Sequence, residues 1–190
     1  KRCVLAGNSF GGYAAWTTAL FHPDRVERLV LVDASGYPYQ AESVPIGFKI
    51  AFTPVLNRLM DGVLPRGVIE RSLKNVYGDP SLVTPDLVDR YFDMATREGN
   101  RYALVERFLQ AQPGPLAGKI PELKLPVLIL WGGRDRLIPP EQGDRFHREI
   151  AGSKLVRFDE LGHVPHEENP AATAAALREF LAQPLPIKIQ

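Results

Sequence analysis

The chain has 190 residues, of which 45% are hydrophobic and 24% charged, a composition typical of one globular domain. The 23 Lys and Arg residues balance 22 Asp and Glu residues, so no basic surplus favours binding to nucleic acid. One cysteine, Cys3, excludes an internal disulfide and a cysteine-rich zinc site, and we expect it to be a small core residue. No apolar run is long enough to span a bilayer.

The first predicted elements lie on either side of a glycine-rich turn. The apolar run 3–6 predicts a strand, and residues 10–21 predict a helix that ends before Pro23. Between them the sequence reads Gly7-Asn8-Ser9-Phe10-Gly11, followed by Gly12. A Gly-x-Ser-x-Gly turn between a strand and a helix is typical of a nucleophile elbow, which exposes the Ser hydroxyl above the sheet.

This turn makes Ser9 the candidate nucleophile. The sharp bend needs neighbours without bulk, so we expect Gly7 and Gly11 to lie where a Cβ would press on the strand or the helix. The backbone N–H of Phe10 would then point at an oxyanion formed on the substrate.

Strands and helices alternate along most of the remaining chain. Three further strands are predicted, at Leu29–Val32, Val127–Leu130 and Lys154–Phe158. Two further helices are predicted, at Pro140–Ile150 and from Pro170 to about Leu181. Asn169 is the expected N-cap of the last helix. Alternation of this kind predicts an α/β fold, with a mostly parallel sheet flanked by helices.

One segment interrupts the alternation. Between residues 37 and 123 there is no convincing strand, and helical patterns are separated by Pro and Gly. Thr84 and Pro85 predict a helix start, with Leu87, Tyr91, Met94 and Ala95 on one face, and residues 68–77 and 101–110 predict two more helices. We therefore divide the chain into core residues 1–36, a helical cap or lid over 37–123, and core residues 124–190.

A Ser nucleophile requires a nearby base, and the chain offers four histidines. His163 follows a predicted strand and a glycine, a position where open α/β sheets place their active sites, so we choose it as the base. His166 is a distant second choice. His22 at a helix end and His147 on a charged helix are expected at the surface. The acids Glu167 and Glu168 are interpreted as charges at a helix start.

The base in turn needs a carboxylate to hold its tautomer, and two acids qualify. Asp135 follows the strand at 127–130 and two glycines, whereas Asp33 follows the strand at 29–32. Both would emerge at the carboxyl edge of the sheet. We choose Asp135, because the chain order Ser9, Asp135, His163 is the order that accompanies this type of elbow.

Four segments together resemble the α/β-hydrolase-fold serine hydrolases with a helical cap. They are the elbow, residues 22–34 (HPDRVERLVLVDA), residues 130–139 (LWGGRDRLIP) and residues 160–170 (ELGHVPHEENP). The resemblance implies an ester hydrolase with a Ser9–His163–Asp135 triad and a Phe10 N–H in the oxyanion hole. It also implies a small-molecule ester substrate, no metal and no organic cofactor.

The resemblance covers the carboxyl-terminal portion of that fold, from the elbow strand onward. We therefore expect amino-terminal strands, and a second oxyanion donor, from a further portion of the same or a companion chain. Without them, the strand at 3–6 would be an uncovered edge.

Other functions remain possible on the same fold. Carbon–carbon bond hydrolases of ring-cleavage products often carry Asn before the nucleophile, as Asn8 does here, but commonly have Trp where this chain has Val164. A cofactor-free perhydrolase would use the same triad. Dehalogenases and epoxide hydrolases use an Asp nucleophile, which disfavours both. A non-catalytic, receptor-like binder of a small ligand is the alternative outside catalysis.

Overall fold

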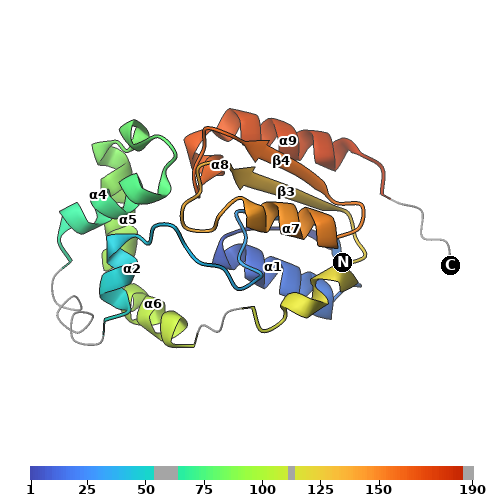
Figure 1. Cartoon of the computed structure of the whole chain (residues 1–190), viewed down its shortest axis with the longest axis horizontal. Helices are drawn as coiled ribbons and strands as arrows, with labels where there is room; N and C mark the ends of the chain where they lie inside the picture. Colours follow the sequence, from blue (N-terminus) through green and yellow to red (C-terminus); the bar gives the residue numbers. More distant parts are fainter. Residues whose placement is uncertain (54–63, 111–113, 186–190) are drawn as a thin grey trace.

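A parallel sheet forms the centre of the molecule. The computed structural model describes residues 1–53, 64–110 and 114–185, and within them the sheet has four strands in the order β1-β2-β3-β4. Its strands are β1 (Cys3–Asn8), β2 (Val26–Val32), β3 (Val127–Gly132) and β4 (Lys154–Phe158). All neighbouring pairs are parallel, so the carboxyl ends of the four strands meet at one edge, which faces the cap helices (Figure 1).

Helices cover both faces of this sheet (Figure 1). They are α1 (Phe10–Phe21) and α7 (Glu141–Glu149) on one face, and α9 (Pro170–Ala182) on the other, preceded by the short α8 (Pro165–Glu168). The alternation of side chains along β2 explains the two layers. Leu29 and Leu31 pack in the cluster that contains Trp16 of α1, whereas Val30 and Val32 pack with Phe180 of α9.

The predicted core elements agree closely with the structure. The helix at 10–21 and the strand at 154–158 have the predicted bounds, and the other three strands extend by two or three residues. Asn169 caps α9 as expected, with its side-chain oxygen accepting a hydrogen bond of 3.0 Å from the Ala172 N–H. The expected α/β fold with a parallel sheet is confirmed.

Helices also fill the described part of the segment between β2 and β3. They are α2 (Ile46–Ala51), α4 (Arg66–Val76), α5 (Pro85–Thr96), α6 (Asn100–Leu109) and two short 3₁₀ turns, η1 (Pro80–Leu82) and η2 (Ala117–Glu122). Figure 1 shows α2, α4, α5 and α6 as a separate group beside the strand ends. We call these four helices the cap. Residues 54–63 and 111–113 of the predicted insertion lie outside the described residues.

One expectation about an individual residue was wrong. Cys3 is exposed on the outer side of β1 and is not a core residue. On the apolar face predicted for α5, Met94 is 49% exposed, and Val88 is the buried residue of this helix. Tyr37 and Ile120, at the two ends of the predicted insertion, pack in the main core beside Phe146 and Trp16.

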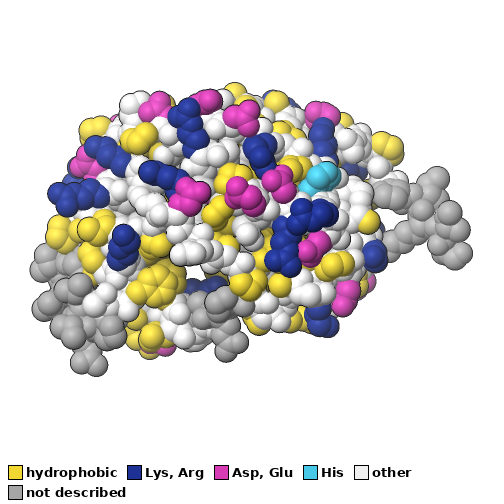
Figure 2. Space-filling view, viewed as in Figure 1, with side chains coloured by type: hydrophobic (Ala, Val, Ile, Leu, Met, Phe, Trp, Pro, Cys, Tyr) yellow, Lys and Arg dark blue, Asp and Glu magenta, His cyan; other side chains and the backbone are white. Residues whose placement is uncertain are grey.

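No helix in the described ranges is sufficiently long and apolar to cross a membrane. Acidic and basic side chains alternate over the face shown in Figure 2, without a large patch of one sign.

Candidate active site

The turn between β1 and α1 is a strained bend centred on Ser9. Ser9 has φ 55° and ψ −119°, a conformation that non-glycine residues rarely adopt and that is characteristic of functional turns. Its N–H donates to the Val32 carbonyl (3.0 Å), and its carbonyl accepts from the N–H groups of Ser35 (3.0 Å) and Tyr13 (3.2 Å). These backbone bonds hold the strained residue in place at the carboxyl edge of the sheet.

Two glycines make room for this bend, and one of them differs from the expected pair. A Cβ on Gly7 would lie 2.1 Å from the Gly11 carbonyl oxygen, so Gly7 is required as predicted. Among the described residues, no atom lies within 4 Å of a Cβ placed on Gly11. The steric role predicted for Gly11 is therefore wrong. Gly12 has that role instead, because its Cβ would lie 2.4 Å from the Cβ of Ala34.

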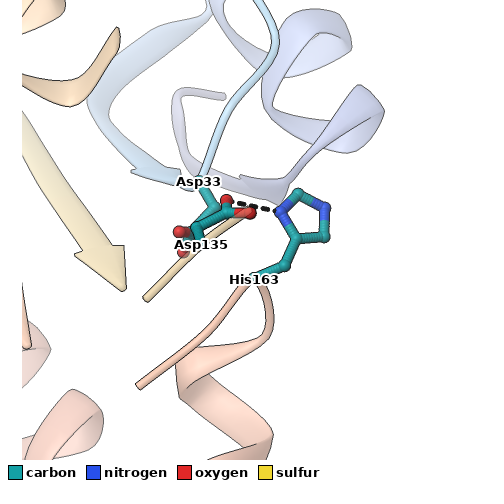
Figure 3. Close-up of side chains that lie close together, drawn as sticks. All are labelled: Asp33, Asp135 and His163. Carbon is teal, nitrogen blue, oxygen red and sulfur yellow. Dashed lines mark hydrogen bonds and ion pairs between the residues drawn. The ribbon is translucent and has the colours of Figure 1, made fainter. Parts of the chain in front are cut away.

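A buried acid–imidazole pair lies on the two loops that follow β3 and β4. The Nδ1 of His163 lies 2.7 Å from Oδ2 of Asp135, and the two residues are 5% and 2% exposed (Figure 3). The other oxygen of Asp135, Oδ1, accepts the N–H groups of Leu137 (2.8 Å) and Ile138 (2.9 Å). Three nitrogen atoms therefore surround this carboxylate at hydrogen-bond distance.

Asp33, the alternative acid, lies beside this pair but does not contact the imidazole through a hydrogen bond. It is fully buried with φ 42°, and its Oδ1 accepts the Gly132 N–H at 2.9 Å. Burial, and next the charge of Asp135, raise the pKa of Asp33 well above its usual range. Both acids follow strands that end at the same edge of the sheet, and the structure places Asp135 against His163.

Two backbone contacts hold the His163 loop beside the elbow and the cap. The side-chain amide of Asn8, the residue before Ser9, donates to the His163 carbonyl at 2.9 Å. The His163 N–H donates to the carbonyl of Val76, the last residue of α4, at 2.8 Å. The structural role of Asn8 was not predicted, although an amide next to the elbow was a signal of it.

The acids after His163 do more than stabilise a helix start. Glu167 accepts hydrogen bonds from the hydroxyls of Tyr77 (3.1 Å) and Tyr91 (2.8 Å) and from Arg90 (2.8 Å). Glu168 accepts the N–H groups of Gly78 (2.8 Å) and Gly162 (2.7 Å). The interpretation as helix-start charges was incomplete, because Glu167 joins α5 of the cap to α8, and Glu168 joins the segment after α4 to the histidine loop.

The other three histidines lie away from this pair. His22 caps the carboxyl end of α1 and is exposed, and His147 is exposed on α7 beside Ser153 (3.0 Å). His166 is exposed on α8, where partial desolvation holds its pKa below the usual range. These positions agree with the expected surface location of His22 and His147.

The cluster of Asp33, Asp135 and His163 has the residue types of a metal site. One ligand atom from each residue lies within 4.8 Å of the others. Three of the four carboxylate oxygens already accept hydrogen bonds, because both oxygens of Asp135 have donors and Oδ1 of Asp33 accepts from Gly132; among the described residues Oδ2 of Asp33 has none. These hydrogen bonds fit a histidine–carboxylate pair better than a cation site.

Ser9 is linked to the pair through the preceding residue, Asn8, whose amide donates to the His163 carbonyl. Within the described residues no hydrogen bond joins the Ser9 side chain to His163, whose Nδ1 is bonded to Asp135. Phe10 is the first residue of α1, and the N–H groups of a first helical turn have no partner within the helix. The guanidinium of Arg107, on α6, lies 3.7 Å from the centre of the Phe10 ring, so the cap also contacts the elbow.

The cap contains an apolar cavity of about 260 Å³. Helices α2, α4, α5 and α6 line it with side chains that include Phe48, Ile69, Leu73 and Leu104. Val76 is part of this lining and also accepts the His163 N–H, so the cavity lies next to the histidine loop. Figure 2 shows an opening between the cap and the core.

Comparisons with known proteins identify relatives that match nearly the whole chain. A model of the alpha/beta hydrolase family matches residues 1–176. A pimeloyl-[acyl-carrier protein] methyl ester esterase of Neisseria meningitidis is 29% identical over 93% of this chain and 68% of its own. A 2-hydroxy-6-oxo-6-phenylhexa-2,4-dienoate hydrolase of Burkholderia cepacia is 28% identical over 94% of this chain and 62% of its own.

A solved structure with the same arrangement is a variant of the meta-cleavage product hydrolase CumD, an enzyme of Pseudomonas fluorescens. It matches with a TM-score of 0.75 and 25% identity, over 95% of this chain and 65% of its own. The chain thus spans about two thirds of the length of the proteins that it matches.

Proposed function

Because the chain belongs to the alpha/beta hydrolase family, we propose that it forms the catalytic part of a serine hydrolase that cleaves carboxylic esters. The observation that carries the proposal is the buried hydrogen bond of 2.7 Å between Asp135 and His163, on a loop that Asn8 ties to the Ser9 elbow. This arrangement provides a nucleophile, a base and an orienting carboxylate at one edge of the sheet.

The hydrogen bond to Asp135 defines the role of each imidazole nitrogen. Nδ1 carries the proton that it donates to Asp135, so Nε2 has the free lone pair of a base. In the proposed reaction, Nε2 accepts the Ser9 proton while the Ser9 oxygen attacks the ester carbon. The resulting imidazolium then donates its proton to the departing alcohol, and an acyl-enzyme remains.

Water completes the proposed cycle. His163 takes a proton from water, the hydroxide attacks the acyl-enzyme carbonyl, and Ser9 leaves with the proton returned from His163. The Phe10 N–H stabilises the oxyanion in both steps. We expect a second donor from the part of the relatives' length that this chain does not span.

The cap favours a small to medium substrate with an apolar part. Its cavity of about 260 Å³ is lined by aliphatic and aromatic side chains and lies behind Val76, next to the histidine loop. An acyl or alcohol group of a few carbon atoms would gain about 0.8 kcal/mol for each methylene buried there. One relative is named as an esterase, which agrees with this substrate class.

Hydrolysis of a carbon–carbon bond is the second candidate. It is favoured by the relatives named as dienoate and meta-cleavage product hydrolases, and by Asn8 before the nucleophile. Val164 disfavours it, because such hydrolases commonly have Trp at the position after the histidine. Val164 itself is 8% exposed and packs with Leu73, Tyr77 and Val88. A non-catalytic ligand binder would have no need for the buried Asp135–His163 pair.

Assays of the complete protein would separate the three functions. We expect turnover of p-nitrophenyl butyrate, slower turnover of a ring-cleavage dienoate, and a loss of about 10⁶ in kcat for Ser9→Ala. Ser35→Ala is the matched control, because Ser35 contacts the elbow through its backbone N–H and should remain active. Faster cleavage of the dienoate would select the second candidate, and binding without turnover of either would select the third.

A further inference from the structure

Asp33 is a buried acid for which the proposed reaction has no use. It lies at the end of β2, fully buried, and its Oδ1 accepts the Gly132 N–H at 2.9 Å. Its second oxygen, Oδ2, is also buried and has no hydrogen-bond donor beside it in the described part of the chain. A buried carboxylate oxygen without a donor is costly, so this atom requires an explanation.

The neighbouring carboxyl group of Asp135 explains why Oδ2 of Asp33 has no donor. Figure 3 shows the carboxyl groups of Asp33 and Asp135 together on one side of the His163 ring, and one ligand atom from each residue lies within 4.8 Å of the others. Two ionised carboxylates this close in a buried site repel each other strongly, so one of them holds a proton. Asp135 has three donors and Asp33 has one, so the charge belongs on Asp135.

The groups that face Asp33 also favour a proton on Asp33 and the negative charge on Asp135. Burial, then the negative charge of Asp135 and the hydrogen bond with it, raise the pKa of Asp33. The charge of Glu168 also raises the pKa of Asp33, and the hydrogen bond from the Gly132 N–H lowers it. His163 interacts with the other carboxylate, through Oδ2 of Asp135.

We propose that Asp33 is a positioning residue of the proposed hydrolase, which remains protonated during catalysis and donates a hydrogen bond from its carboxyl group to the Asp135 carboxylate. Asp33 would thus hold two parts of the loop that follows β3 and contains Asp135. Its Oδ1 holds the Gly132 backbone where β3 ends, and its protonated oxygen orients the carboxylate that holds His163. This inference rests on the proposed function, because it assigns Asp135 as the acid.

Asp33→Asn and Asp33→Gly test the two parts of this inference in the complete protein. An Asn amide keeps an acceptor for Gly132 and a donor for Asp135, so Asp33→Asn should retain kcat within about threefold and keep the pH profile of kcat/KM. Asp33→Gly suits the φ of 42° but removes the donor. It should lower kcat about ten- to a hundredfold at an unchanged KM, the usual effect of losing a hydrogen bond to a charged group.

Asp135→Asn is the matched comparison, with an expected loss of about 10⁴ in kcat. The proposal is overturned if Asp33→Asn loses as much activity as Asp135→Asn. It is also overturned if Asp33→Asn moves the acidic limb of the pH profile to lower pH, since that would reveal a negative charge on Asp33. Wild-type kcat in a folded Asp33→Gly variant would equally contradict a positioning role.

Infrared difference spectroscopy makes the proton on Asp33 testable without turnover. At neutral pH the unmodified protein should show the carbonyl band of a protonated buried carboxyl, and Asp33→Asn should lack it. A protein without esterase activity that still shows this band would refute the proposed function and leave the proton on Asp33 in place. Absence of the band would refute the proton assignment whatever the activity.

Discussion

The side-chain amide of Asn8 donates a hydrogen bond of 2.9 Å to the backbone carbonyl of His163, although the two residues are 155 positions apart. The same amide donates to the Val32 carbonyl at 3.2 Å. One side chain therefore connects the end of β1, the end of β2 and the histidine loop. This contact gives Asn8 a structural reason to precede the candidate nucleophile.

Asn8→Asp should test this connection. The carboxylate has the shape of the amide but cannot donate to either carbonyl, so we expect a loss of about 1–3 kcal/mol in the free energy of unfolding. We also expect a fall in kcat, because the His163 loop loses its link to the elbow. Chemical unfolding and steady-state kinetics measure the two effects. Unchanged stability together with unchanged kcat would show that the contact is dispensable.

The pH dependence of activity should identify the base. A neutral imidazole must accept the Ser9 proton, so kcat/KM should fall as the pH drops through the range in which histidines become protonated. His163→Ala should abolish activity, whereas His166→Ala should retain most of it, since His166 has no hydrogen bond with the pair. Equal damage from the two variants, or a flat profile down to pH 5, would reject His163 as the base.

The hydrogen bond from Tyr91 to Glu167 should make the cap less stable at alkaline pH. Burial, and then the bond with Glu167, raise the pKa of Tyr91, so its contribution to stability is complete below about pH 10. That contribution is lost as the pH rises further, because the unfolded chain then releases a proton that the folded chain retains. The folded protein should therefore lose stability above pH 10.

Tyr91→Phe isolates this contribution. At pH 8 the variant should be less stable by about 1.5 kcal/mol, and its difference from the unmodified protein should shrink above pH 10. Tyr102→Phe is the matched control, because Tyr102 is 66% exposed on α6. Urea unfolding at a series of pH values gives both differences. A Tyr91→Phe difference that does not change with pH would contradict the assignment.

The outer edge of β1 should promote association of residues 1–190 expressed alone. Within the described residues β1 pairs with β2 only, and Val4 is 37% exposed. Unpaired backbone groups on an apolar edge strand are templates for pairing with another chain. We expect oligomers in sedimentation velocity and fewer of them for Val4→Lys. Leu109→Lys, at a 72% exposed position of the cap, should change nothing. A monodisperse monomer of the unmodified chain would refute this expectation.

Local patterns in the sequence determined the elements and most of the candidate site. Uninterrupted apolar runs predicted the buried strands, and Thr84 and Asn169 predicted two helix starts at which their side chains accept N–H groups of the first turn. Ser9 could be predicted because the strained turn requires glycines within a few residues of it, and His163 because it follows a strand and a glycine. These features depend on neighbours along the chain, so a single sequence contains them.

Only the tertiary structure could decide between groups that the sequence made equivalent. Asp33 and Asp135 both follow parallel strands and reach the same edge, and their distance from His163 depends on the packing of adjacent strands and loops. The same holds for Asn8, Glu167 and Glu168, whose partners lie on segments distant in sequence. The steric need for Gly12 rather than Gly11 arises from Ala34 beyond β2. Such contacts depend on how separate segments pack, and no local pattern specifies them.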